Sequence, residues 1–210
     1  LVARVDFSAT ITDATNNLTD IRFGVFDSLG TRNTANLTGG MNSSTFATDT
    51  GYATRFVPTP AGSSTPPFTL HRRNPTGAFT DPLNQLTSGT EYVDVAPVTG
   101  SVRNPVASGV PHTYTFTIER LSATETRLTA AITDSGTFNI NATATETSAT
   151  PHTTFDWFGF RIPTGRIADI TITRWQAELI PAAPVITTQP TPADQTVSVG
   201  ANVNYSVTAT

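Results

Sequence analysis

Apolar and polar residues alternate along most of the chain with a period of two residues. The run His112–Leu121 is the clearest case, because His, Tyr, Phe and Ile alternate there with threonines. Such alternation places the apolar side chains on one face of a β-strand. Periodicity of the helical kind is almost absent. The pattern predicts ten strands: Leu1–Thr12, Thr19–Asp27, Gly51–Val57, Pro67–Arg73, Thr90–Val95, His112–Leu121, Glu125–Thr133, Thr137–Thr145, Thr154–Ile162 and Ala168–Leu179.

Segments rich in glycine, proline and aspartate separate these strands. Asp134-Ser-Gly136 lies between two alternating runs and predicts a tight hairpin. Pro181-Ala-Ala-Pro184 marks a boundary, beyond which the chain carries a single charged residue. We therefore expect one domain over residues 1–182 and a separate segment over 183–210. Two or three further strands are expected in that segment: Val185–Gln189, Gln195–Val199 and Asn202–Ala209.

Composition supports strands nearly everywhere. The 210 residues are 37% hydrophobic and only 13% charged, and threonine is the commonest residue. Threonine is β-branched and suits half-exposed pleated surfaces. About ten strands with short turns predict an all-β, antiparallel sandwich or barrel.

Charge and residue usage exclude several function classes. The chain has no cysteine, so disulfides, thiolate metal sites and cysteine nucleophiles are absent. Its 12 basic residues are all arginine, the net charge is -4, and no basic stripe is visible, which argues against nucleic acid as a partner. No apolar run approaches the ~20 residues of a membrane-spanning helix.

Two stretches carry a resemblance to a known fold family. One is Val110–Arg120 followed by Thr126–Ile132, and the other is Phe155–Arg161 followed by Ala168–Trp175. Together they resemble the closing half of concanavalin A-like (laminin G-like) jelly rolls. The resemblance implies an antiparallel two-sheet jelly-roll sandwich over residues 1–182.

The C-terminal segment carries a second resemblance. Pro184–Pro190, Gln195–Gly200 and Val203–Ala209 are similar to the first three strands of bacterial immunoglobulin-like domains. The resemblance implies a partial, incomplete Ig-like segment. Bacterial surface proteins and polysaccharide-degrading enzymes often combine such modules, so the two resemblances imply an extracellular or cell-surface bacterial module with carbohydrate as its commonest ligand class.

The search for catalytic residues favours a protein that is not an enzyme. Jelly-roll glycosidases place two carboxylates on one face of a strand, at positions i and i+2, and no predicted strand has such a pair. A polysaccharide lyase needs a Tyr or His base with arginines that hold the uronate. His71, Arg72 and Arg73, near Tyr52 and Arg55, contain the required residue types without diagnostic spacing.

The strand around Trp157 provides the best candidate for glycan binding. Phe158 and Phe160 share one face and predict a core, whereas Trp157, Gly159 and Arg161 share the other. A ring that stacks on the sugar and a planar donor beside a glycine are typical of glycan sites. The alternative is that Trp157 lies under a loop and Arg161 pairs with an aspartate.

Two further binding candidates come from residue patterns. Alternation places Trp175 on the same face as Thr173, either exposed or covered by the tail. Arg72 and Arg73, with Arg55, form the densest positive patch in the sequence. Such a patch would suit an acidic sugar. The alternative is that these arginines lie at a loop edge in contact with solvent.

These observations give three hypotheses. The first is a non-catalytic carbohydrate-binding module. The second is a structural subunit of an extracellular filament or surface assembly, joined by strand donation from the C-terminal tail. The third is a polysaccharide lyase. No cofactor is expected, and no recognised metal-ligand spacing occurs; a structural calcium held by loop carbonyls and one aspartate would leave no sequence pattern.

Overall fold

The structure is a computed structural model. It describes residues 1–12, 21–30, 48–56, 68–74, 83, 92–96, 98–100, 106–161, 167–181, 186–188, 199 and 208–209. The chain divides into two compact units, Leu1–Glu178 and Leu179–Thr210.

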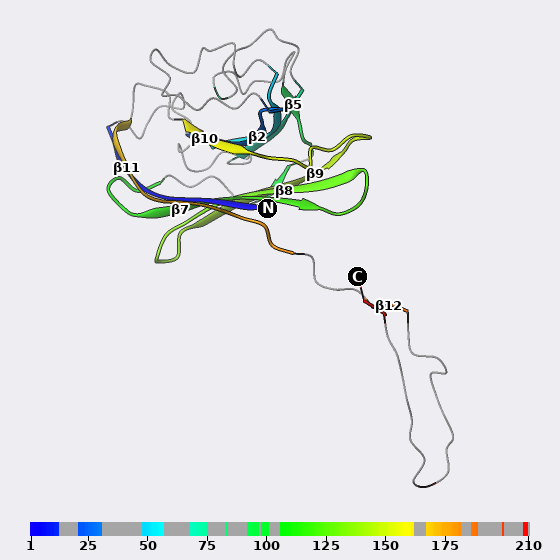
Figure 1. The fold of residues 1–210 in the computed structure, drawn as a ribbon. Coiled ribbons are helices and arrows are strands. Elements are labelled where there is room, and N and C mark those ends of the chain that lie inside the picture. Colours follow the sequence, from blue (N-terminus) through cyan, green and yellow to red (C-terminus); the bar gives the residue numbers. More distant parts are fainter. Residues whose placement is uncertain are drawn as a thin grey trace. The chain divides into compact units, whose positions relative to one another are not determined.

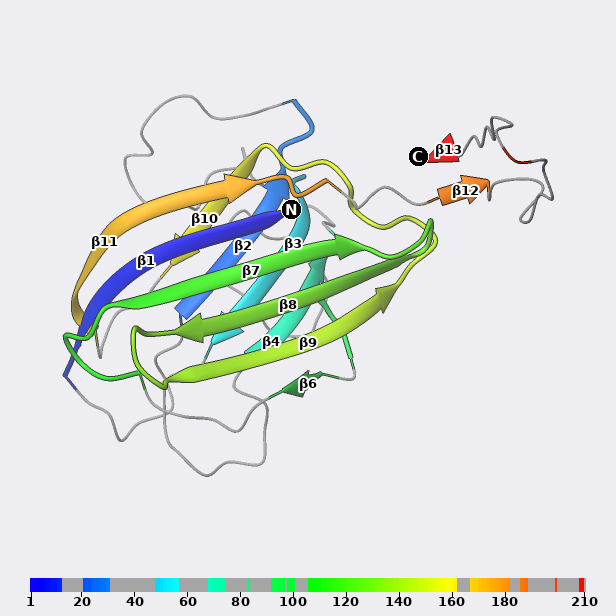
Figure 2. The ribbon, with the colours of Figure 1, turned by 90° about the horizontal axis from the view of Figure 1, so that it is seen from below.

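The first unit consists of two antiparallel sheets that pack face to face (Figure 1). One sheet has six strands in the order β11-β1-β7-β8-β9-β6, which Figure 2 shows side by side, and the other has five in the order β10-β2-β3-β4-β5. The strands are β1 Val2–Ile11, β2 Ile21–Asp27, β3 Thr50–Phe56, β4 Phe68–Arg73, β5 Tyr92–Asp94, β6 Thr99–Gly100, β7 His112–Arg120, β8 Glu125–Thr133, β9 Asn139–Thr147, β10 Trp157–Arg161 and β11 Ile167–Glu178.

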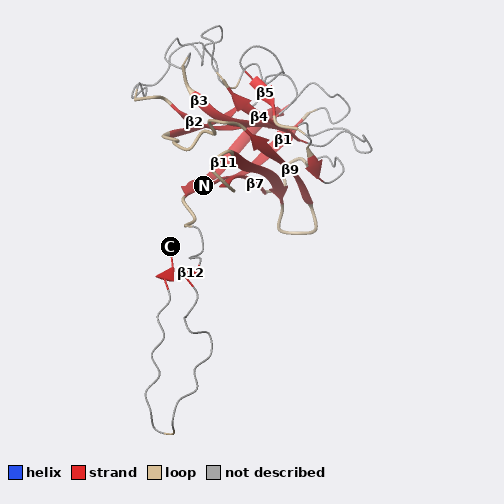
Figure 3. Cartoon of the chain, turned by 90° about the vertical axis from the view of Figure 1, so that its right-hand side faces the viewer, coloured by secondary structure: helices blue, strands red, loops and turns tan. Residues whose placement is uncertain are grey.

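The prediction of an all-β, antiparallel sandwich is confirmed; the jelly-roll classification remains a prediction. The described part of the chain contains strands and loops only (Figure 3). It therefore contains no helix long and apolar enough to cross a membrane. Each of the ten predicted strands has a counterpart, and among the strands that the structure describes in the first unit only the two-residue β6 was not predicted. The hairpin at Asp134 is also confirmed, since Asp134 Oδ1 accepts hydrogen bonds from the backbone N–H groups of Gly136 and Phe138.

The main core lies between the two sheets. In β7, buried and partly exposed residues alternate from His112 to Ile118, as the sequence pattern predicts. Phe23 of the five-stranded sheet lies 5.4 Å, centroid to centroid, from the ring of Tyr114 in β7. Phe158 and Phe160 also pack against this core, so their predicted face is confirmed. Burial of these apolar side chains from both sheets is what holds the sandwich together.

The predicted face of Trp175 is wrong because of a β-bulge. The pairing of β1 with β11 shifts between Asp6 and Phe7, so that Trp175 lies opposite the buried Val5 and Ile172 lies opposite the buried Phe7. One extra residue in β11 thus moves Trp175 to the face directed at the core. Its ring packs 5.0 Å from that of Phe158 and keeps 41% of its surface exposed.

The five-stranded sheet is buried on both of its faces near its centre, unlike the six-stranded sheet. A second apolar cluster, formed by Phe26, Ala53, Leu83 and Tyr92 with Trp157 packed against it, covers the face directed away from the main core. We call this face the outer face. Leu83 comes from the chain between β4 and β5. The outer face therefore combines apolar cover with the polar side chains described below.

The second unit contains one pair of short strands. β12 (Ile186–Thr188) pairs antiparallel with β13 (Thr208–Ala209). These strands overlap two of the three predicted in the tail. The predicted strand Gln195–Val199 lies outside the described residues except for Val199, which is in a turn. The similarity to an Ig-like segment remains a prediction.

Candidate functional site

Three arginines form a row across the outer face. Arg161 of β10 lies directly opposite Arg22 of β2, and Arg22 lies directly opposite Arg55 of β3. The register partner of Arg55 on the next strand is Thr69 of β4. All four residues are partly exposed. We call Arg161, Arg22 and Arg55 the arginine row; since adjacent strands lie about 4.8 Å apart, its three Cα positions span about 10 Å.

Small residues form the next row of the same face. Gly159, Gly24 and Ala53 lie opposite one another on β10, β2 and β3. Leu83 rests on this floor, because a Cβ built at Gly159 would be 2.8 Å from Leu83 Cδ1. The carbonyl oxygen of Leu83 accepts a 2.7 Å hydrogen bond from Nη1 of Arg22. The small floor thus lets an apolar side chain pack directly beside the arginine row.

Trp157 lies on the outer face together with Arg161, as the sequence predicts. Its ring centroid is 4.6 Å from that of Phe26, and its Nε1 donates a 2.9 Å hydrogen bond to Oδ2 of Asp49. The indole is partly buried. Trp157 therefore packs against the second cluster. A ligand could contact the part of its indole that remains exposed.

The carboxylate of Asp49 is buried next to Trp157. Burial is the main reason that the pKa of Asp49 is raised from 3.8 to about 6. The hydrogen bond from Trp157 and the charge of Arg73 lower that pKa, whereas the charges of Asp156 and Asp27 raise it. Asp49 is thus a titratable group poised just below neutral pH on this side of the molecule.

His71 connects the end of the arginine row to an acidic residue. Its Nδ1 lies 2.9 Å from Oδ1 of Asp94, and its Nε2 lies 2.8 Å from Oγ1 of Thr69. Burial lowers the pKa of His71 to about 4; Asp94 opposes this shift, while Arg55 and Arg22 add to it. The imidazole is therefore neutral at pH 7. Because Nδ1 faces a carboxylate oxygen of Asp94, we assign the proton to Nδ1, so that Nε2 accepts the Thr69 hydroxyl.

Tyr52 and Arg72 lie on the opposite face of the sheet from His71. The hydroxyl of Tyr52 donates a 2.7 Å hydrogen bond to Oε2 of Glu146 on β9, and Nε of Arg72 lies 3.2 Å from Oε1 of the same carboxylate. Burial raises the pKa of Tyr52 to about 12, and the bond to Glu146 adds to the shift. The three side chains form a polar connection between the two sheets.

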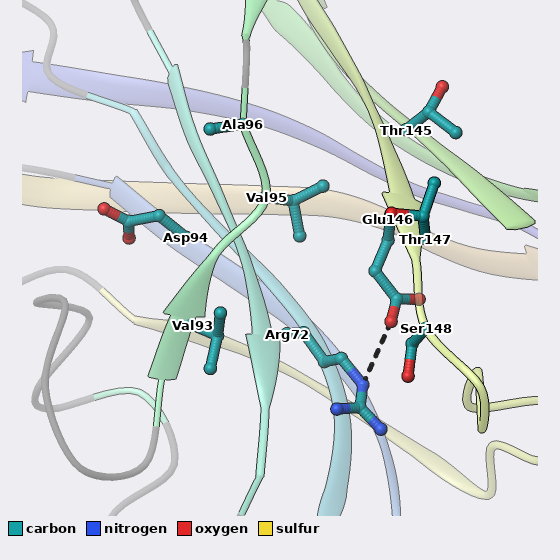
Figure 4. A pocket seen from close by; sticks show the side chains of 9 residues that line it. All are labelled: Arg72, Val93, Asp94, Val95, Ala96, Thr145, Glu146, Thr147 and Ser148. Carbon is teal, nitrogen blue, oxygen red and sulfur yellow. Dashed lines mark ion pairs between the residues drawn. The ribbon is translucent and has the colours of Figure 1, made fainter.

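This ion pair borders a pocket at the edge of the sandwich. Figure 4 shows the Arg72 and Glu146 side chains directed at each other across it. The pocket has a volume of about 300 Å³. Its lining comes from β4, β5, β9 and the residues after them: Arg72, Val93, Asp94, Val95, Ala96, Thr145, Glu146, Thr147 and Ser148.

Two predicted groupings are corrected by these positions. The expected positive patch of Arg55, Arg72 and Arg73 is wrong, because Arg72 faces the Glu146 pocket and the Arg73 side chain is fully buried. The lyase set is divided in the same way. Consecutive residues of β4 point to opposite faces, so His71 and Arg55 lie on one face of the sheet and Tyr52 and Arg72 on the other.

Sequence reasoning missed Arg22, Thr69 and Asp94. A signal for Arg22 existed, because it alternates with Ile21 and Phe23, whose burial directs it outward. No comparable signal identifies which strands lie next to β2, and that order is what brings the arginines together.

Among the described residues, no group of three or more His, Asp or Glu side chains is arranged to hold a metal ion. The fold and the site define a β-sandwich with an arginine-bearing outer face. No family model matches the chain, and searches of curated proteins and of solved structures find no match. The two family resemblances therefore remain predictions, and the geometry carries the functional argument.

Proposed function

We propose that the chain is a non-catalytic glycan-binding module of a secreted or cell-surface bacterial protein, with its ligand on the outer face of the five-stranded sheet. The arginine row beside Trp157 carries the proposal. Planar guanidinium groups donate paired hydrogen bonds to sugar hydroxyl or acid groups, and an indole ring packs on the C–H face of a sugar.

The outward face of the six-stranded sheet offers less to a glycan. Its side chains there include threonines that bond to each other, such as Thr129 and Thr143 at 3.0 Å. Its charges include the exposed pair of Arg127 and Glu119, in which Arg127 Nε donates to the carboxylate at 3.0 Å. Short hydroxyl side chains provide no ring on which a sugar could stack, which supports the five-stranded sheet as the binding side.

The separation of the candidate lyase residues supports binding without catalysis. Tyr52 is fully buried, and its raised pKa keeps the hydroxyl protonated at neutral pH, where it donates to Glu146. A phenol in that state does not abstract a proton from a sugar.

A polysaccharide panel tests this proposal. The full chain is run by affinity electrophoresis through gels that contain neutral or acidic polysaccharides, and each mixture is assayed for new reducing or unsaturated ends. We expect retention without product. Product formation would contradict the non-catalytic part of the proposal, and mobility unchanged by every polysaccharide would contradict binding.

Assembly through the C-terminal unit is the second candidate. It is favoured by three large apolar side chains that this unit leaves exposed: Leu179, Ile180 and Val199. Sedimentation velocity of the full chain and of a Leu179→Ser, Ile180→Ser variant provides the test. Concentration-dependent association that the variant loses would support assembly, and a monomer at all concentrations would contradict it.

A further inference from the structure

We infer that the free edge of β10 accepts a strand from the C-terminal segment of a second copy of this chain. The inference goes beyond the glycan-binding function proposed above, and it rests on the assembly candidate, whose acceptor it names. Its basis is the side of the sandwich where β10 and β11 end the two sheets (Figure 2).

The core is incompletely covered at this side of the sandwich. Phe158 and Phe160 of β10 are only partly buried, whereas Phe23 on the neighbouring strand β2 is fully buried. The ring centroid of Trp175 on β11 lies 5.0 Å from that of Phe158 and 5.9 Å from that of Phe160, and 41% of the Trp175 surface is exposed. An apolar surface that continues over two strands in this way is typical of a contact site.

The number of strands explains why Trp175 stays exposed. In the described part of the chain, the six-stranded sheet has one strand more than the sheet that packs on it. The ring of Phe160 lies 5.9 Å from the rings of both Phe7 on β1 and Trp175 on β11, so β10 packs over the boundary between these two strands. One further strand beside β10 would therefore lie over β11 and cover Trp175.

β10 also lacks the features that protect an edge strand against strand addition. Natural edge strands carry charged residues, prolines or bulges. β11 has a bulge and the charges of Asp169, Arg174 and Glu178. β10 pairs with β2 in unbroken register, and its central residues Phe158-Gly-Phe160 carry no charge. Of these two edge strands, β10 is thus the one open to pairing.

The described strands at the opposite side of the sandwich are better protected. β5 is three residues long and ends in Asp94, whose side chain is half exposed and pairs with His71. β6 has only two residues. Short or charged edge strands offer little to an added strand.

The C-terminal segment has the composition of a donated strand. From Gln195 to Thr210 the chain contains no charged residue and no proline, so each residue keeps a backbone N–H for pairing. Within it Val203, Tyr205 and Val207 alternate with polar residues. Such a strand beside β10 would direct its three apolar side chains toward the exposed part of Trp175 and its polar side chains toward solvent.

Donation between copies makes every chain both a donor and an acceptor. The donor segment and the acceptor edge belong to different compact units of the chain. A chain that donates its segment keeps its own β10 edge open for the next copy. Contacts of this kind are head-to-tail, so they extend into a filament unless the rotation between copies closes a ring.

Variants of the full chain test donor and acceptor separately. Tyr205→Asp places a charge on the apolar face of the donor, and Trp175→Glu places one on the surface that the donated strand would cover. Because a buried charge without a partner is costly, sedimentation velocity should show association at least about tenfold weaker for each variant than for the unaltered chain. Ser206→Asp and Thr171→Glu are matched controls, because they add the same charges on the polar faces of the two strands, and both should associate normally.

A mixture of the two variants is the sharpest measurement. Tyr205→Asp keeps an intact acceptor and Trp175→Glu keeps an intact donor. An equimolar mixture should therefore form a heterodimer and nothing larger, at a concentration where each variant alone is monomeric. Thermal unfolding shows whether both variants are folded. If Trp175→Glu is unfolded, the comparison of Tyr205→Asp with Ser206→Asp decides.

The outcomes separate this inference from the functions proposed above. Two folded variants that form no heterodimer, or a Tyr205→Asp variant that associates as well as Ser206→Asp, would overturn the inference. Association that Trp175→Glu leaves unchanged would overturn the acceptor and leave the assembly candidate standing. An unaltered chain that stays monomeric would overturn both, and glycan binding by that monomer would still support the glycan-binding function.

Discussion

Asp49 shows how a single buried residue shapes the outer face. Its carboxylate accepts the indole N–H of Trp157 and is close enough to Arg73, Asp27 and Asp156 for their charges to affect its pKa. Removal from water favours the protonated form, so the folded protein holds a proton on Asp49 that the unfolded chain releases. Stability therefore depends on pH through this residue.

The variant Asp49→Asn tests this dependence. Because folding raises the pKa of Asp49 from 3.8 to about 6, its stabilising contribution is present below pH 4 and is lost as pH rises through 6. We expect the variant to gain stability over the unaltered chain between pH 4 and 6, reaching about 1–3 kcal/mol above pH 6. Guanidinium unfolding at pH 4, 5, 6 and 7 measures this. The histidines are the same in both proteins, so a difference that stays constant with pH would contradict the assignment to Asp49.

Trp157 provides a second prediction at this scale. Trp157→Phe keeps an aromatic ring against Phe26 and removes the N–H that bonds to Asp49. A buried carboxylate that loses a donor should cost about 1–3 kcal/mol of unfolding free energy at pH 7. Chemical denaturation measures this loss, and the cost should shrink in the Asp49→Asn background. An equal cost in both backgrounds would show that the hydrogen bond is not its source.

At the scale of the strands, register decides which residues meet. Alternation along the sequence correctly placed Phe158 and Phe160 toward the core and Trp157 and Arg161 away from it. The same reasoning failed for Trp175, because the bulge in β11 reverses the faces beyond it and the local sequence gives no sign of a bulge. Alternation thus predicts faces only within an uninterrupted strand.

The start of β3 provides a prediction about strand geometry. Gly51 has a φ of +152°, and a Cβ there would collide with the carbonyl oxygen of Val25 and lie 2.8 Å from the Cα of Phe26. Gly51→Ala should therefore cost about 2–4 kcal/mol, from backbone strain and collision together. Gly30→Ala is the matched control: its φ is +81° with open space around the site, so only strain of about 1 kcal/mol is expected. Chemical denaturation compares them, and equal costs would contradict the close approach of β2 and β3.

At the scale of the whole molecule, the sequence predicted most of the described strands and their positions but few of the pairings between them. The turn signal Asp134-Ser-Gly136 between two alternating runs identified β8 and β9 as partners, since such contacts are local. The arginine row joins three strands that are distant in sequence, and only the folded sheet order makes them adjacent. The sequence could therefore identify Arg55 and Arg161 as candidate site residues. It could not show that the two lie in one row across the sheet.

The division into two units carries a prediction of its own. All the described buried residues of the main core lie within Leu1–Glu178. Removal of residues 179–210 should leave the free energy of unfolding within about 1 kcal/mol of that of the full chain, because none of the described side chains of the main core is lost. Thermal unfolding followed by circular dichroism measures this. A large drop in the midpoint would show that the second unit stabilises the first.

The most direct test of the account is to map where a glycan contacts the chain. Backbone amide shifts of the full chain are followed by NMR during titration with an oligogalacturonate of defined length. The account predicts that the changes concentrate at Arg161, Arg22, Arg55 and Thr69, on four adjacent strands of one face. Changes centred on Glu146 and its pocket, changes spread over the six-stranded sheet, or no changes at all would contradict it.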